Sequence, residues 1–95
     1  MKALQDKVIW ITGALGMLGQ SAVRMFLERG AKIMASDIKP LEHAPQIARL
    51  RTQFGEERFQ YTQADLSDED QAAAAAAQID ERFGRLDGTY HTVYA

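Results

Sequence analysis

The sequence predicts one α/β domain over residues 1–95, with three layers in which helices cover a parallel sheet of four strands. Two observations carry this prediction. Strand-like and helix-like segments alternate along the chain as β-α-β-α-β-α-β, with short connections, and a glycine-rich turn follows the first apolar run. Right-handed crossovers then give the sheet order 3-2-1-4, with a ligand crevice expected between the first and fourth strands.

Four short segments rich in β-branched and aromatic residues are predicted to be strands. The first is a continuous apolar run from Val8 to Ile11, which is typical of a strand buried on both faces. The second strand ends at Asp37, and the third places Phe59 and Tyr61 on one face by alternation. The expected strands are 7–12, 31–36, 58–63 and 89–94.

Three helices are predicted between these strands, over 16–29, over 44–54 and from Ser67 to Phe83. The first has an apolar stripe that includes Leu18, Ala22, Met25 and Phe26. In the third, Ser67 is expected to be the N-cap, with acidic residues in the first turn. Its six consecutive alanines favour a helix that lies close to the sheet, and Gly84 is expected to end it.

The glycine-rich turn has the spacing G-x-x-G-x-x-G between a predicted strand and a predicted helix. Gly13 would allow the tight turn, Gly16 a close approach of backbone to phosphate, and Gly19 close packing of the helix. Asp37 follows Gly19 by 18 residues, close to the spacing at which an acid binds adenosine ribose hydroxyls. This context predicts a dinucleotide site; the alternative is a glycine-rich turn with no ligand.

The turn from Thr12 to Gly19 resembles the cofactor turn of the short-chain dehydrogenase/reductase family. Asp37, the run Asp65-Leu66-Ser67-Asp68 and the run Phe83-Gly84-Arg85-Leu86-Asp87 are similar to further family landmarks and occur in the family's order. The resemblance implies a Rossmann-like domain of an oxidoreductase that transfers hydride between a nicotinamide cofactor and a carbonyl or alcohol. It covers only the N-terminal part of the family's domain, so a truncated form is expected.

The resemblance also implies which residues would bind the cofactor. Gly13, Leu15, Gly16, Met17 and Leu18 would line the pyrophosphate, and Gly19 would complete the turn. Asp37 would accept hydrogen bonds from the ribose hydroxyls. Ile38 would lie against the adenine, and Asp65 and Leu66 would border the adenine from the other side. For Asp37 and Asp65 the alternative is a carboxylate that only caps a helix or a turn.

Asp37 also predicts the choice of cofactor. Its carboxylate would repel the 2′-phosphate of NADP, and neither Leu15 nor Gly16 supplies a positive charge. The nearby Lys39 could simply be solvated. NAD is therefore predicted rather than NADP.

Two departures from the family bear on catalysis. His91-Thr92-Val93-Tyr94 stands where the family has N-N-A-G, although His91 or Thr92 could still offer polar contacts. The chain has no asparagine and no lysine after Lys39, so the family's Tyr-x-x-x-Lys pair for acid–base catalysis cannot be formed. No catalytic residue is predicted: Tyr90 and Tyr94 are interpreted as strand residues, and binding without turnover is expected.

The middle glycine, Gly16, falls where the family's extended members have it, whereas the run from Phe83 to Asp87 resembles the compact members. No subclass is therefore assigned.

Composition excludes several other classes. The net charge of −2 gives no electrostatic basis for binding nucleic acid or an anionic membrane. No apolar run approaches the ~20 residues of a membrane span. The sequence contains no cysteine, which excludes disulfides and is compatible with the cytoplasm. His43 and His91 are isolated, so no metal site is predicted.

Two alternatives to an oxidoreductase portion stay open, namely a stand-alone nucleotide-binding or regulatory module and a structural fragment without catalysis. The fourth predicted strand is the last element of the sequence, which would leave its outer edge unpaired. Because unpaired edges invite strand pairing, a homodimer or larger assembly through this edge or the adjoining sheet face is expected.

Overall fold

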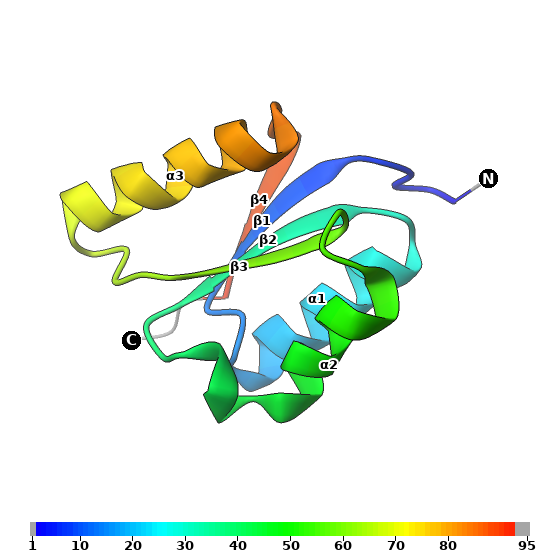
Figure 1. Cartoon of the computed structure of the whole chain (residues 1–95), viewed down its shortest axis with the longest axis horizontal. Helices are drawn as coiled ribbons and strands as arrows, with labels where there is room; N and C mark the ends of the chain where they lie inside the picture. The colour runs from blue at the N-terminus through cyan, green and yellow to red at the C-terminus, as the bar shows by residue number, and fades with distance from the viewer. Residues whose placement is uncertain (1, 93–95) are drawn as a thin grey trace.

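The computed structural model describes residues 2–92 and contains one parallel sheet with the strand order β3-β2-β1-β4 (Figure 1). This confirms the predicted fold class and strand order. The strands are β1 (Val8–Thr12), β2 (Lys32–Asp37), β3 (Phe59–Gln63) and β4 (Gly88–His91). Their carboxyl ends lie at one edge of the sheet, where Thr12 pairs with Ser36 on one side and with His91 on the other.

In the described part of the chain, three α-helices form the outer layers. Figure 1 shows α1 (Met17–Glu28) and α2 (Pro45–Phe54) on one face of the sheet and α3 (Glu69–Phe83) on the other. A short 3₁₀ turn, Leu41–His43, precedes α2 and was not predicted from the sequence. No helix within residues 2–92 has the length and apolar character required to cross a membrane.

The core is unequal on the two faces of the sheet. On the face of α1 and α2, the largest fully buried side chains include Phe59, Ile11, Leu27, Ile47 and Leu50. The face of α3 has a smaller cluster of Val8, Met34 and Ile79, with Trp10 and Phe83 partly buried beside it. β1 and β2 contribute to both clusters, which explains why their sequences are apolar without alternation.

The prediction that Ser67 caps α3 was wrong. The N-cap is Asp68, whose side chain accepts hydrogen bonds from the N–H groups of Asp70 and Gln71. Ser67 is taken up by the preceding turn, because its N–H and hydroxyl both donate to Asp65. The end of the helix at Gly84 is as predicted, with a left-handed φ of 74°.

Within the described residues the fourth strand runs from Gly88 to His91, and the Thr92 N–H still bonds to the Thr12 carbonyl at 3.1 Å. It begins one residue earlier than predicted. The predicted continuation over 93–94, with Tyr94, lies outside the described residues.

Candidate functional site

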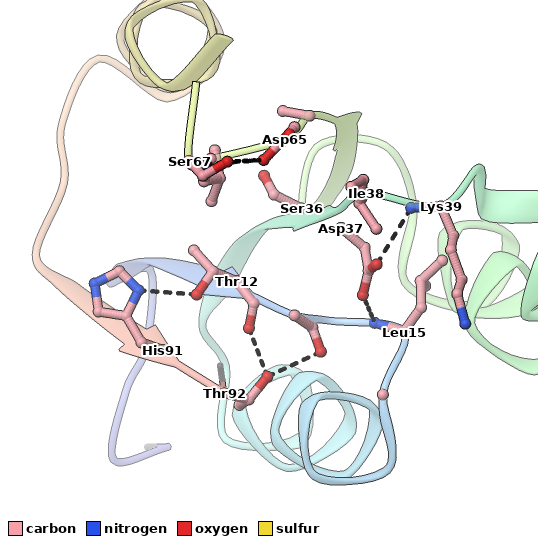
Figure 2. A pocket seen from close by; sticks show the side chains of 14 residues that line it. Thr12, Leu15, Ser36, Asp37, Ile38, Lys39, Asp65, Ser67, His91 and Thr92 are labelled. Carbon is pink, nitrogen blue, oxygen red and sulfur yellow. Dashed lines mark hydrogen bonds between the residues drawn. The ribbon is translucent and has the colours of Figure 1, made fainter. Parts of the chain in front are cut away.

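A cavity of about 680 Å³ lies at the carboxyl ends of the four strands. Figure 2 shows it between the turn that follows β1 and the loops that follow β2 and β3. The cavity includes the position between β1 and β4 where the ligand crevice was predicted, and it also extends past the ends of β2 and β3. The lining residues are Thr12, Gly13, Leu15, Gly16, Ser36, Asp37, Ile38, Lys39, Ala64, Asp65, Leu66, Ser67, His91 and Thr92.

The glycine turn forms one wall of this cavity. Gly13 has φ 67°, a conformation that favours glycine, and its carbonyl accepts the N–H of Gly16 at 3.1 Å. A Cβ on Gly19 would lie 2.1 Å from the Gly13 carbonyl oxygen, so only glycine lets α1 pack this closely on the turn. Gly13 and Gly19 therefore have the structural roles that the sequence predicted.

The start of α1 is open to a ligand. Its N-cap is Gly16, no side chain caps it, and its first turn has no acidic residue. The N–H groups of Met17, Leu18 and Gly19 have no acceptor within the helix, because they belong to its first turn. Together with the helix dipole, these groups can bind an anion.

The side chains of Met17 and Leu18 do not line the cavity. They are 86% and 69% exposed, respectively, and point away from the core. Of the residues predicted for the pyrophosphate, these two can therefore contribute only their backbone N–H groups, as can Gly19, which is buried.

The carbonyl groups of the turn are occupied by donors from elsewhere in the chain. The Thr92 hydroxyl lies 2.6 Å from the Thr12 carbonyl oxygen and 2.9 Å from that of Gly13. The Gln20 side-chain amide donates to the Leu15 carbonyl at 2.8 Å. These contacts fix the carbonyl groups of Thr12, Gly13 and Leu15, whereas the first-turn N–H groups of α1 have no acceptor within the helix.

Asp37, at the end of β2, joins two walls of the cavity. One carboxylate oxygen accepts the Leu15 N–H at 2.9 Å, and the other accepts the Lys39 N–H at 3.2 Å (Figure 2). Because each carboxylate oxygen has two lone pairs, the group can still accept further hydrogen bonds from a ligand. The Asp37 carboxylate thus both stabilises the neighbouring turns and lines the cavity.

Asp65 closes the turn between β3 and α3. One of its oxygens accepts both the Ser67 hydroxyl, at 2.6 Å, and the Ser67 N–H, at 3.0 Å. These hydrogen bonds from Ser67, that of the side chain foremost, lower the pKa of Asp65 below its ordinary value. This is the turn carboxylate that the sequence left open as an alternative, although Asp65 and Leu66 also line the cavity.

Seven lining residues were not among the predicted cofactor-binding residues, although the sequence left polar contacts from His91 or Thr92 open; most of the seven lie where a parallel strand ends. One of them is His91. Its Nδ1 lies 2.8 Å from the Thr12 hydroxyl, because the two residues occupy paired positions on β4 and β1. The rule that ligands bind at the carboxyl ends of parallel strands could have identified them. They are Thr12, Ser36, Lys39, Ala64, Ser67, His91 and Thr92.

Neither described tyrosine is among the residues that line the cavity. The Tyr61 hydroxyl donates to the Lys39 carbonyl, and the Tyr90 ring packs edge-on against Phe26 of α1 with 5.7 Å between centroids. Within residues 2–92 no group of three or more histidine, aspartate or glutamate side chains is placed to hold a metal ion.

The sequence matches the family model described as short chain dehydrogenase over residues 7–93. A short chain dehydrogenase/reductase, dpchG, from Colletotrichum higginsianum is 34% identical over 84 residues, which are 88% of this chain and 31% of that protein. The cis-4-hydroxycyclohexanecarboxylate dehydrogenase of Sinomonas cyclohexanicum is 33% identical over 86 residues, 90% of this chain and 33% of that protein.

Solved structures of similar proteins show the same fold. A 3-ketoacyl-(acyl-carrier-protein) reductase from Brucella melitensis, complexed with NADH, matches with a TM-score of 0.79 and 29% identity, over 92% of this chain and 34% of that one. A short chain dehydrogenase/reductase from Burkholderia phymatum, in complex with NAD, has a TM-score of 0.80 and 26% identity, over 94% and 31% of the two chains.

The chain spans about a third of the length of the curated relatives that it matches. The family model nevertheless covers nearly all of its residues. The chain belongs to the short-chain dehydrogenase/reductase family and corresponds to an N-terminal portion of that family's domain.

Proposed function

We propose that this chain binds NAD and forms the dinucleotide-binding portion of a short-chain oxidoreductase. The observation that carries the proposal is the uncapped start of α1 in the same cavity as Asp37. The helix start supplies donors for a pyrophosphate, and Asp37 supplies an acceptor for ribose hydroxyls. The relatives that were solved with NAD or NADH support the same class of ligand.

In this proposal the cofactor lies along the carboxyl edge of the sheet. The N–H groups of Met17 and Leu18 bind the pyrophosphate beside Gly13, Leu15 and Gly16. Ile38 contacts the adenine on one side, and Asp65 and Leu66 border it on the other. When bound, the cofactor supplies hydride chemistry, whereas these residues only bind and orient it.

NAD is proposed rather than NADP because of the charge at Asp37. Both of its oxygens accept hydrogen bonds from backbone N–H groups, which holds a negative charge where we expect the adenosine ribose. Lys39 lines the same cavity, and it is the only lysine or arginine among the lining residues. One flexible ammonium group offsets only part of this repulsion.

Hydride transfer between the nicotinamide and a carbonyl or alcohol is proposed for the oxidoreductase to which this portion belongs. The 95 residues contain no Tyr-x-x-x-Lys pair, so we expect the chain alone to bind without turnover. We also expect it in the cytoplasm and as a homodimer through β4. A regulatory nucleotide-binding module is the second candidate, because the same cavity would serve it without any catalytic group.

Calorimetric titration of the 95-residue chain with NADH and with NADPH tests the proposal. We expect NADH to bind, and NADPH to bind about tenfold more weakly, since one like-charge contact costs on the order of 1 kcal/mol. Replacing Asp37→Ala should weaken NADH binding by about tenfold to hundredfold, the usual cost of losing hydrogen bonds to a charged group.

Two variants serve as controls for Asp37→Ala: Asp37→Asn tests the charge alone, and Asp80→Ala removes a carboxylate away from the cavity. Asparagine removes the negative charge but retains a hydrogen-bond acceptor, so it should narrow the difference in affinity between NADH and NADPH. Asp80 is exposed on α3, so its replacement should leave both titrations unchanged. Absence of heat with NADH, together with an unchanged melting temperature, would contradict the proposal and favour a structural fragment.

A further inference from the structure

The segment that follows β2 is held against β3 by three consecutive carbonyl groups. The Asp37 carbonyl accepts the Ala64 N–H at 2.9 Å, and the Ile38 carbonyl accepts the Gln63 side-chain amide at 3.1 Å. The Lys39 carbonyl accepts the Tyr61 hydroxyl. Two of the three donors are side chains of β3, so they continue the hydrogen bonding of the sheet beyond its last backbone pair, Asp37 with Gln63.

Little else holds this segment in place. Ile38 is 61% exposed, so apolar burial contributes little to its position. Lys39 is exposed, and Pro40 has no N–H with which to bond to a neighbouring strand. Apart from these carbonyl groups, two described hydrogen bonds hold the segment: the Lys39 N–H donates to Asp37, and the Pro40 carbonyl accepts the His43 N–H at 3.0 Å.

Tyr61 is suited to this role by its surroundings. Its ring packs against the core cluster beneath α1 and α2, while its hydroxyl reaches the Lys39 carbonyl. Burial, together with the negative charges of Asp37 and Glu42, raises the pKa of Tyr61 above its ordinary value. The hydroxyl therefore remains protonated and donates across the whole physiological range.

We propose that Tyr61 and Gln63 are positioning residues for the adenosine end of the cavity. By fixing Ile38 and Lys39, they hold the side chain expected against the adenine and the N–H group that orients the Asp37 carboxylate. The same carboxylate accepts the Leu15 N–H, so the orientation set from β3 also reaches the glycine turn. This inference rests on the proposed function, because it assumes an adenosine-containing ligand.

Binding of NADH and of AMP to Tyr61→Phe and to Gln63→Ala, measured by calorimetry, tests the proposal. Each variant removes one donor to a partly hydrated carbonyl, so we expect affinities about threefold to tenfold weaker. Because the affected residues face the adenosine, the loss should be the same factor for NADH and for AMP. Gln63 is exposed, so its variant should fold even if Tyr61→Phe is destabilised.

Two matched variants control for loss of the same chemical groups elsewhere. Tyr90→Phe removes a hydroxyl from β4, and Gln53→Ala removes an exposed amide from α2; neither residue lines the cavity. Both should bind NADH and AMP as the unaltered chain does.

Amide hydrogen exchange adds a measurement that needs no ligand. The Lys39 N–H should exchange several-fold faster in both variants, whereas the Ile33 N–H, bonded to the Arg58 carbonyl at 2.7 Å within the sheet, should not change. A merely structural effect would accelerate exchange at both positions.

The outcomes separate this inference from the proposed function. If the unaltered chain binds neither NADH nor AMP, the proposed function is overturned and this inference with it. If it binds both and the two variants bind them equally well, only the inference is overturned. Weakened binding of NADH with unchanged binding of AMP would likewise overturn it, because the effect would then lie outside the adenosine end.

Discussion

At the scale of single residues, the glycines of the turn serve different physical purposes. A Cβ on Gly19 would meet backbone atoms of Gly13 and Ala14 at 2.1 and 2.7 Å, which cannot move aside. A Cβ on Gly16 would meet only the Gly13 carbonyl oxygen, at 3.5 Å, and Gly16 has an ordinary φ of −75°. Gly19 is therefore required by the fold, whereas Gly16 is required only if a ligand approaches the turn.

Replacing each of these glycines by alanine should separate the two purposes. Gly19→Ala should lower the free energy of unfolding by roughly 1–3 kcal/mol, the usual cost of overpacking. Gly16→Ala should change it by less than about 0.5 kcal/mol, as at a site without strain, and should weaken NADH binding. Urea unfolding and calorimetry measure the two effects. A stable Gly19→Ala chain, or unchanged NADH binding by a well-folded Gly16→Ala chain, would contradict this assignment.

At the scale of elements, the sequence was sufficient for the sheet order and for most helix boundaries. Apolar runs, helical stripes and glycines that end helices depend on neighbours close in the chain, so they can be read without tertiary contacts. The start of α3 could not be predicted in this way, because serine and aspartate are both good N-caps and Ser67 and Asp68 are adjacent. What decides between them is the turn made by Asp65, which engages Ser67.

The candidate site was predictable to a similar degree. The glycine turn and Asp37 follow from spacing along the chain. The hydroxyl of Thr92 at the turn carbonyls, and the Tyr61 and Gln63 contacts to the segment after β2, join residues that are 22 or more apart in sequence. Such contacts appear only once the register of the sheet is known.

One carboxylate supports the attachment of β4 to β1, beside the backbone pairing of the two strands. Asp87 accepts hydrogen bonds from the Arg85 guanidinium at 2.6 and 2.9 Å and from the Val8 N–H at 2.8 Å. These bonds, that of Arg85 foremost, lower the pKa of Asp87 below its ordinary value of 3.8. Because the folded chain then binds the proton less readily than the unfolded chain, Asp87 adds stability above about pH 4 that is lost as the pH falls further.

Asp87→Asn should therefore remove part of the dependence of stability on pH. We expect the free energy of unfolding of the unaltered chain to fall between pH 7 and pH 3, and that of the variant to fall less. Urea titrations at both pH values measure this, with Asp80→Asn as a control because Asp80 has no side-chain partner among the described hydrogen bonds. An identical loss of stability in all three chains would contradict the role of Asp87.

At the scale of the whole molecule, the sheet is covered unevenly. α1 and α2 bury a large apolar cluster on one face, whereas α3 buries a small one over β1 and β2 (Figure 1). β4 is the least buried strand: three of its four residues are exposed, and it lies at one edge of the sheet. Within residues 2–92 no strand pairs with its outer edge.

A second copy of the chain can cover this edge. Two β4 strands that pair around a two-fold axis would satisfy each other's free backbone groups without adding any other element. We therefore expect a dimer in analytical ultracentrifugation of the 95-residue chain at tens of micromolar. Thr89→Lys places a charge on the exposed face of β4 and should shift the chain to monomer, because charged side chains oppose edge pairing.

Thr52→Lys is the matched control, since it adds the same charge to an exposed position of α2, away from β4. It should sediment as the unaltered chain does. A monomer at every concentration would show that the uneven cover of the sheet is tolerated without a partner. An equal shift in both lysine variants would mean that net charge, rather than the edge of β4, governs association.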